Sequence, residues 1–172
     1  MNTGRVYRSI DKIVAAYQVK LDATDEEAFT VTPPIGGWSY SEVYSHIFDA
    51  SLLSLLALNN ASRGVGEIKH THSLVKLILF FGSFPPTKRY KVPLRLANRV
   101  KKIEKLTAQQ LIRDFEFQLK KLYPQLAQAD PSIKVKHPRM GYLNAEQWLR
   151  FIEIHLGHHL KQINRIERSF KQ

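Results

Sequence analysis

Two histidines four residues apart, His155 and His159, have the residue type and the spacing of a metal-binding pair. Four residues are a little more than one turn of an α-helix, so both imidazoles leave a helix on the same side. Imidazole nitrogens bind Zn²⁺ and other divalent transition metals, and a site with three such ligands leaves a position open for water or a substrate. The pair therefore predicts a metal centre if another part of the fold brings a third nitrogen to it.

The segment around this pair, residues 143–170, has the pattern of a long amphipathic helix. Asn144 is suited to cap its first turn, and Gln147 stands at the reciprocal position of a capping box. The core-facing stripe of this helix consists of Trp148, Ile152, His155, His159, Ile163, Ile166 and Phe170. Because the two histidines interrupt an apolar stripe, groups inside the fold must supply partners for their ring nitrogens.

A third histidine, His46, lies on a comparable stripe of a second predicted helix. This helix follows Trp38, begins with a capping box of Ser39 and Glu42, and runs to about Ala61. Its stripe consists of Val43, His46, Ala50, Leu53 and Ala57. A lone histidine on such a face is usually a satisfied core residue, but a second helix with a paired-histidine motif favours a ligand role.

Two more long helices are predicted, over residues 6–21 and from a cap at Thr107 to about residue 127. Residues 72–84 are compatible with a short buried helix, and residues 94–105 with a short basic one. The connectors 22–38 and 128–142 contain prolines and glycines and are expected to be irregular.

Four amphipathic helices with long connections and no alternating strand pattern predict an all-α four-helix bundle with negligible β structure. A chain of 172 residues is expected to form one domain, residues 1–172. Bundle cores are places where side chains on facing helices assemble metal sites, so His46, His155 and His159 form a plausible three-nitrogen set. His158 competes with His159 for the third position, but it falls on the side of Phe151 and Ile154.

Two motifs of this chain, GWSYSEVYSHIFDAS and NAEQWLRFIEIHLGHHLKQINRI, resemble those of the DinB/YfiT-like superfamily. The resemblance implies a four-helix bundle of up-down-down-up order. It also implies a divalent metal held by one histidine of the second helix and two of the last, which correspond here to His46, His155 and His159. Members of that superfamily include thiol transferases that use a low-molecular-weight thiol, hydrolase-like proteins and proteins without a known activity.

The composition limits the chemistry that the chain can perform. It contains no cysteine, which excludes disulfides, thiolate metal ligands and a cysteine nucleophile and suits the cytoplasm. No signal peptide or membrane span is evident. The formal charge is +11, and the densest basic stretch, residues 88–105, is interpreted first as a solvated surface. Nucleic-acid binding through it is not expected, because it lacks aromatic interleaving and a groove-reading motif.

The expected function is that of a metal-dependent enzyme, a thiol transferase or hydrolase acting on a small molecule, with Zn²⁺ or Ni²⁺ as cofactor. A low-molecular-weight thiol is a candidate co-substrate, and a homodimer is left open. The alternative is a metal- or ligand-binding or stress-response bundle without turnover. Asp49 and Glu153 are available as carboxylates behind the metal ligands. Trp38 and Trp148 are interpreted as core residues, and His70, His72 and His137 as solvated or locally hydrogen-bonded residues.

Overall fold

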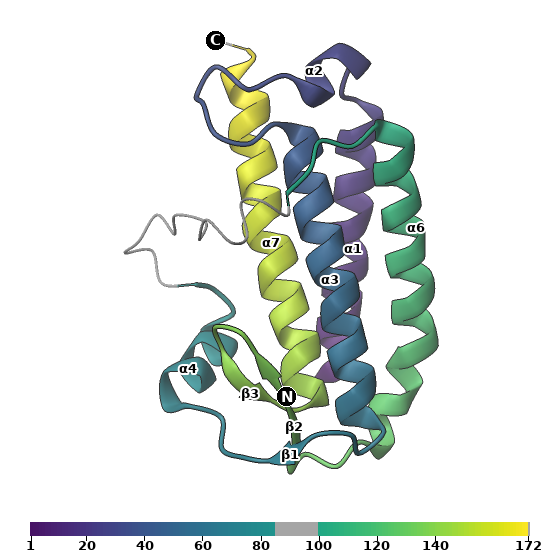
Figure 1. Cartoon of the computed structure of the whole chain (residues 1–172), viewed down its shortest axis with the longest axis vertical. Helices are drawn as coiled ribbons and strands as arrows, with labels where there is room; N and C mark the ends of the chain where they lie inside the picture. Colours follow the sequence, from purple (N-terminus) through teal and green to yellow (C-terminus); the bar gives the residue numbers. More distant parts are fainter. Residues whose placement is uncertain (85–99, 172) are drawn as a thin grey trace.

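Four long helices lie side by side in the computed structural model, which describes residues 1–84 and 100–171 (Figure 1). They are α1 (Thr3–Asp22), α3 (Tyr40–Ser62), α6 (Lys105–Leu122) and α7 (Ala145–Ser169). Helices α1 and α7 run in one direction, and α3 and α6 run in the other. The predicted all-α four-helix bundle of up-down-down-up order is therefore confirmed. None of the described helices is both long and apolar enough to cross a membrane.

The capping residues fix where the two histidine-bearing helices begin. Ser39 and Glu42 form the predicted capping box of α3, and Asn144 and Gln147 form that of α7. Asn2 caps α1 by accepting a hydrogen bond of 2.9 Å from the backbone N–H of Arg5. Local polar contacts therefore set the start of each of these helices.

The predicted start of the third long helix was wrong. Helix α6 begins at Lys105, and Glu104 rather than Thr107 is its N-cap residue, without a side-chain capping bond. Contacts from outside the helix fix this earlier start. Ser41 exchanges two hydrogen bonds of 2.6 Å with the backbone of Ile103, and the Lys105 ammonium donates one of 2.6 Å to the carbonyl of Thr24. The helix ends at Leu122, and a 3-10 helix, η1 (Tyr123–Gln128), follows.

The connectors contain more regular structure than predicted. A three-stranded antiparallel sheet joins β1 (Glu67–Ile68), β2 (Ile133–His137) and β3 (Gly141–Leu143) in that order. The expectation of an irregular connector over 128–142 was therefore wrong. These strands are too short to show a clear alternation in the sequence, and the sheet packs at the end of the bundle where α7 begins (Figure 1). Connector 22–38 contains the short helix α2 (Glu26–Thr30).

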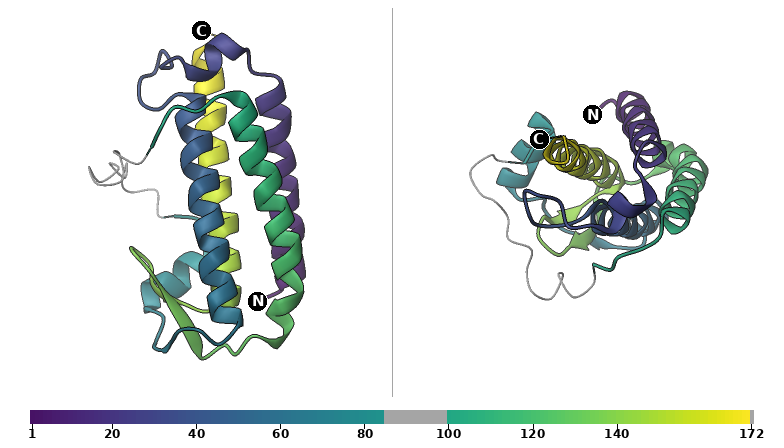
Figure 2. Two further views of the ribbon diagram at one scale, coloured as in Figure 1. Left: turned by 45° about the vertical axis from the view of Figure 1, so that its right-hand side comes forward. Right: turned by 90° about the horizontal axis from the view of Figure 1, so that it is seen from above.

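Helix α4 (Ser73–Phe81) lies outside the bundle beside α7 (Figure 2). A helix in this region was predicted, but most of it is not buried. Val75 and Leu79 are buried and Ile78 is half-buried against the core, whereas Leu74, Leu77, Phe80 and Phe81 are exposed. The expected basic helix over 94–105 falls largely outside the described residues, and residues 100–104 are not helical.

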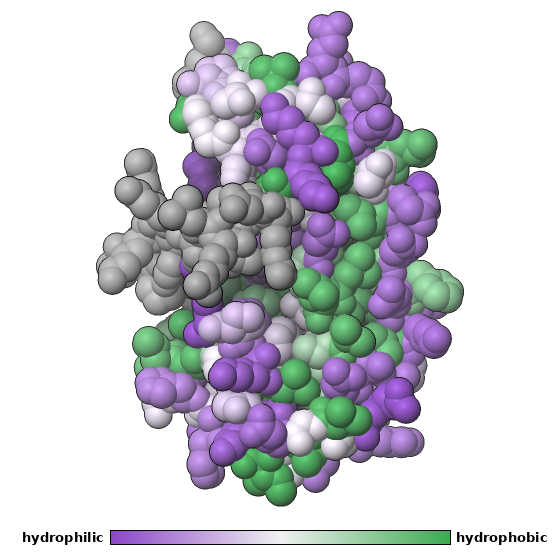
Figure 3. Space-filling model, in the orientation of Figure 1, coloured by the Kyte–Doolittle hydropathy of each residue, from purple (hydrophilic) through white to green (hydrophobic). Residues whose placement is uncertain are grey.

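A buried aromatic group joins α1, α3 and α7. The Tyr17 hydroxyl donates 2.9 Å to the carbonyl of Leu156, and the Tyr44 hydroxyl donates 2.7 Å to the carbonyl of Tyr17. Both tyrosines are fully buried, and their rings pack edge to face with centroids 5.5 Å apart. Because Leu156 directly follows His155, this contact helps to fix the position of the paired histidines along the bundle. The face of the molecule seen in Figure 3 carries many hydrophilic side chains, with hydrophobic groups over α3 and α6 and near α4.

Candidate metal centre

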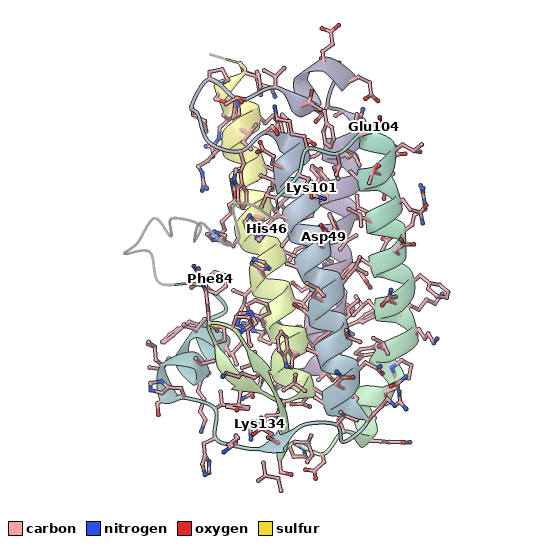
Figure 4. The ribbon with its side chains drawn as sticks, viewed as in Figure 1. His46, Asp49, Phe84, Lys101, Glu104 and Lys134 are labelled. Atoms are coloured by element: carbon pink, nitrogen blue, oxygen red, sulfur yellow. The ribbon has the colours of Figure 1, made fainter. Side chains whose placement is uncertain are left out.

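Three histidines from two helices meet between α3 and α7. His46 comes from α3, and His155 and His159 come from α7. One ring nitrogen of each lies within 4.8 Å of the corresponding nitrogens of the other two. The ring centroid of His46 is 5.5 Å from that of His155 and 4.9 Å from that of His159, and the last two are 4.8 Å apart. Figure 4 shows His46 at the boundary between the two helices. The structure thus brings together all three residues that the sequence selected.

Aromatic side chains enclose this three-histidine cluster. Trp38 lies 5.0 Å from the ring of His46 and is nearly parallel to that of His159, with centroids 6.3 Å apart. Phe151 stacks on His155 at 5.3 Å. His159 is only 7% exposed. These contacts give the cluster an apolar surrounding, in which charged groups are poorly stabilised. They also give Trp38 a role beside the site that its interpretation as a core residue did not include.

Burial keeps the three imidazoles neutral. It lowers the pKa of His46, lowers that of His155 well below its ordinary value, and lowers that of His159 to about 3. The neighbouring imidazoles lower the pKa of His155 and His159 further. Metal binding requires an unprotonated ring nitrogen, so all three side chains have the protonation state of ligands at neutral pH.

Gln162 contacts a ring nitrogen of His159 at hydrogen-bond distance. The side-chain oxygen of Gln162 lies 2.9 Å from Nδ1 of His159, and it can only accept a hydrogen bond. When Nδ1 donates this hydrogen bond, the lone pair of His159 is at Nε2. Metal-binding histidines commonly hold their second nitrogen in this way. Gln162 was not among the site residues predicted from the sequence, although its position three residues after His159 places both on one helix face.

The carboxylates considered for this supporting role have other partners. Asp49 follows His46 by one turn and is exposed, and its hydrogen bond is to Ser45 (Figure 4). Glu153 forms an ion pair with Arg150 on the same helix. Within the described part of the chain, no hydrogen bond joins either carboxylate to the three imidazoles, so Gln162 takes the place that they were expected to fill.

We expect Gln162→Ala to weaken metal binding about 10–100-fold, because the variant leaves the Nδ1 proton of His159 without its acceptor. Gln162→Glu keeps an acceptor at the same position and should retain most of the affinity. A competition titration against a chromophoric chelator measures both variants. An affinity of Gln162→Ala equal to that of the parent would show that the hydrogen bond does not support a ligand.

The remaining histidines lie outside the cluster. His158 is exposed, with its ring 5.1 Å from His159 and 5.5 Å from Phe84. His137 is locally hydrogen-bonded as predicted, because its Nδ1 accepts from the backbone N–H groups of Arg139 at 3.0 Å and Met140 at 2.9 Å. His72 accepts from the backbone N–H of Leu74 at the start of α4. The structure thus separates the three clustered imidazoles from His158, the adjacent competitor.

The donor set fits a divalent ion of the zinc type. An ion bound tetrahedrally at 2.0–2.1 Å places its nitrogen ligands roughly 3.4 Å apart. The nitrogens of the cluster, which lie within 4.8 Å of one another, reach this separation with small side-chain rotations. Three neutral imidazoles without a carboxylate favour Zn²⁺, Ni²⁺ or Cu²⁺ over Mg²⁺ or Ca²⁺, which prefer oxygen ligands.

Comparisons with known proteins agree with this architecture. One similar structure is that of YfiT from Bacillus subtilis, which is described as a probable metal-dependent hydrolase with an unusual four-helix bundle topology. The TM-score is 0.66 at 12% sequence identity, and the alignment covers 98% of this chain and 87% of YfiT. TT2238, described as a four-helix bundle protein, is similar with a TM-score of 0.56 at 19% identity, over 95% of this chain and 99% of that one. No curated protein sequence matches the chain. The family model of the DinB superfamily matches residues 11–163, and the chain therefore belongs to the DinB superfamily.

Proposed function

We propose that this protein is a metal-dependent enzyme that acts on a small molecule, with His46, His155 and His159 as its metal ligands. The observation that carries the proposal is the convergence of three neutral imidazoles from two facing helices, with one ring nitrogen of each within 4.8 Å of the others. Membership of the DinB superfamily and the description of YfiT as a probable metal-dependent hydrolase support it.

Zn²⁺ or Ni²⁺ bound by three imidazoles would supply a nucleophile at neutral pH, from water or from a thiol. Water as the nucleophile gives hydrolysis, and a thiol gives transfer of that thiol to an electrophilic substrate. The chain has no cysteine, so a thiol would have to be a separate small molecule. The two reactions share one site and differ only in the molecule that enters it.

The surrounding side chains have roles that follow from their positions. Trp38 and Phe151 cover the imidazoles and restrict the access of bulk water, which strengthens electrostatic interactions within the site. Gln162 lies at hydrogen-bond distance from Nδ1 of His159 and supports that ring when Nδ1 is the donor. His158 lies beside His159 and is exposed, so it is placed to accept a proton from the entering nucleophile.

The experiment that tests this function compares metal-loaded and metal-free protein on two substrate panels. Activated esters and amides report hydrolysis, and monochlorobimane with cysteine or glutathione reports thiol transfer. We expect turnover on one panel that is lost when the metal is removed by a chelator and restored when Zn²⁺ or Ni²⁺ is added back. Stoichiometric metal binding without turnover on either panel would favour the alternative of a metal-binding module.

A further inference from the structure

A cavity of about 190 Å³ lies beside the three-histidine cluster, between the segment after α4 and the outer side of α7. Ile13, Ile154 and Gly157 give it an apolar floor. Gly157 has no side chain to extend from this floor. A Cβ atom added at Gly157 would lie 3.9 Å from the nearest side-chain atom, on Ile13. Polar side chains also line the cavity, Glu153, His158 and Lys161 from α7 and Ser83 from the segment after α4.

The wall opposite α7 is held in place by Arg150. The guanidinium of Arg150 donates a hydrogen bond of 2.9 Å from Nε to the carbonyl of Leu79, near the end of α4. Gly82 follows with a φ of +70°, and a side chain at this position would collide with the same guanidinium. These contacts turn the chain so that Ser83 and Phe84 line the cavity, and Phe84 lies beside α7 (Figure 4).

The cavity adjoins the cluster through two of its lining side chains, each of which lies beside an imidazole of the cluster. His158 lines the cavity, and its ring is 5.1 Å from that of His159. Phe84 also lines the cavity, and its ring is 6.5 Å from that of His155. The side chains of His158 and Phe84 therefore lie between a molecule in the cavity and the three imidazoles.

Two cationic side chains, Lys161 and Arg165, lie at one side of this cavity. Lys161 lines the cavity, and Arg165 lies one turn further along the same side of α7. Neither side chain has an ion pair with a carboxylate in the described part of the chain, and residues 85–99 contain no Asp or Glu. The acidic residue that lines the cavity, Glu153, is already paired with Arg150.

We infer that this cavity is the subsite that binds the anionic end of the substrate, with Lys161 and Arg165 pairing with a carboxylate while the reactive end lies at the three-histidine cluster. The inference rests on the proposed function and adds a substrate class, small organic acids. The cavity is smaller than the 300–1,000 Å³ of typical ligand pockets, which suits one end of a molecule. An apolar floor with cations at one side matches a short aliphatic chain that ends in a carboxylate.

The test uses glutarate as the anionic probe and glutaramide as its neutral counterpart. Both are titrated into the ¹⁵N-labelled protein, with and without Zn²⁺, while backbone amide shifts are recorded. Glutarate should bind the parent about tenfold more tightly than glutaramide, the effect of one charge-assisted hydrogen bond. The largest shifts should fall on residues 82–84 and 157–161. In the metal-free double variant Lys161→Gln/Arg165→Gln, the two probes should bind equally.

The control is Lys120→Gln/Lys121→Gln, which removes the same charge from an exposed part of α6 on the other side of the bundle (Figure 2). Its preference for glutarate should equal that of the parent. The inference is wrong if Lys161→Gln/Arg165→Gln keeps the preference, if both double variants lose it alike, or if the shifts map elsewhere. Metal content is measured on the same samples, so a failure of the proposed metal site is seen separately from a failure of anion binding.

Discussion

Replacing His155 with alanine is expected to abolish tight metal binding, and His46→Ala and His159→Ala should have the same effect. The three nitrogens form the entire protein ligand set that the described residues offer at this position. Two remaining imidazoles cannot hold a three-ligand site in its geometry. After loading with Zn²⁺ and dialysis, each variant should fall from about one equivalent of metal per chain to less than about a tenth.

His158→Ala is the matched control, because it removes a histidine adjacent to the cluster. It should bind metal with the stoichiometry of the parent. Metal that binds only the folded state also stabilises it. Zn²⁺ should therefore raise the melting temperature of the parent and of His158→Ala, but not that of the three ligand variants. If His158→Ala loses metal while His159→Ala keeps it, the ligand assignment is wrong by one residue. If all four variants keep the metal, the cluster is not a metal site.

Metal-free protein is expected to lose stability as the pH falls from 7.5 to 5.5. Burial lowers the pKa of His159 to about 3 and that of His137 to about 4, and it lowers the pKa of His155 as well. In the unfolded chain these side chains regain a pKa of about 6.5. Below that pH the unfolded chain binds protons that the folded protein does not, so protonation favours unfolding. The stabilisation is complete above pH 6.5 and declines as the pH falls toward the folded pKa values.

The loss should reach about 1.4 kcal/mol per pH unit for each such histidine once the pH is below 6.5. Urea unfolding at several pH values measures it. His137→Asn keeps a hydrogen-bond acceptor for the backbone N–H groups of Arg139 and Met140 but cannot be protonated, so its stability should depend less on pH. A free energy of unfolding that stays constant between pH 7.5 and 5.5 would show that the imidazoles are not held neutral by the fold.

The features that the sequence predicted correctly depend on short-range patterns. The caps at Ser39 and Asn144 act within one helical turn, and the apolar stripe around His155 follows the period of the helix. In the stripe around His46, Leu53 was predicted to face the core but is 63% exposed. Two helices whose histidines both face the core bring these side chains together once the helices pack. The bundle could therefore be predicted from the residue pattern, which also made the set of three imidazoles plausible. The resemblance to the DinB/YfiT-like superfamily implied the order of the helices and the three ligands.

The features that the sequence did not predict depend on contacts between distant residues. Ser41 and Ile103 set the start of α6, although a capping pattern at Thr107 suggested a later one. The sheet pairs Glu67 with Lys134 across a long stretch of chain, and neither strand is long enough to show a pattern. The wall of the cavity depends on the close approach of the Arg150 guanidinium, from another helix, to Gly82, where a side chain would collide with it. Such pairings can be recognised only once the tertiary fold is known.

The most direct test of the three-histidine metal centre is the metal content of the unmodified protein. The protein is purified without a metal-affinity column, and its metals are measured by inductively coupled plasma mass spectrometry. We predict about one equivalent of Zn²⁺ or Ni²⁺ per chain, either as isolated or after loading and dialysis, as expected for a site with three imidazole ligands. Less than about a tenth of an equivalent after loading would contradict a metal centre at His46, His155 and His159.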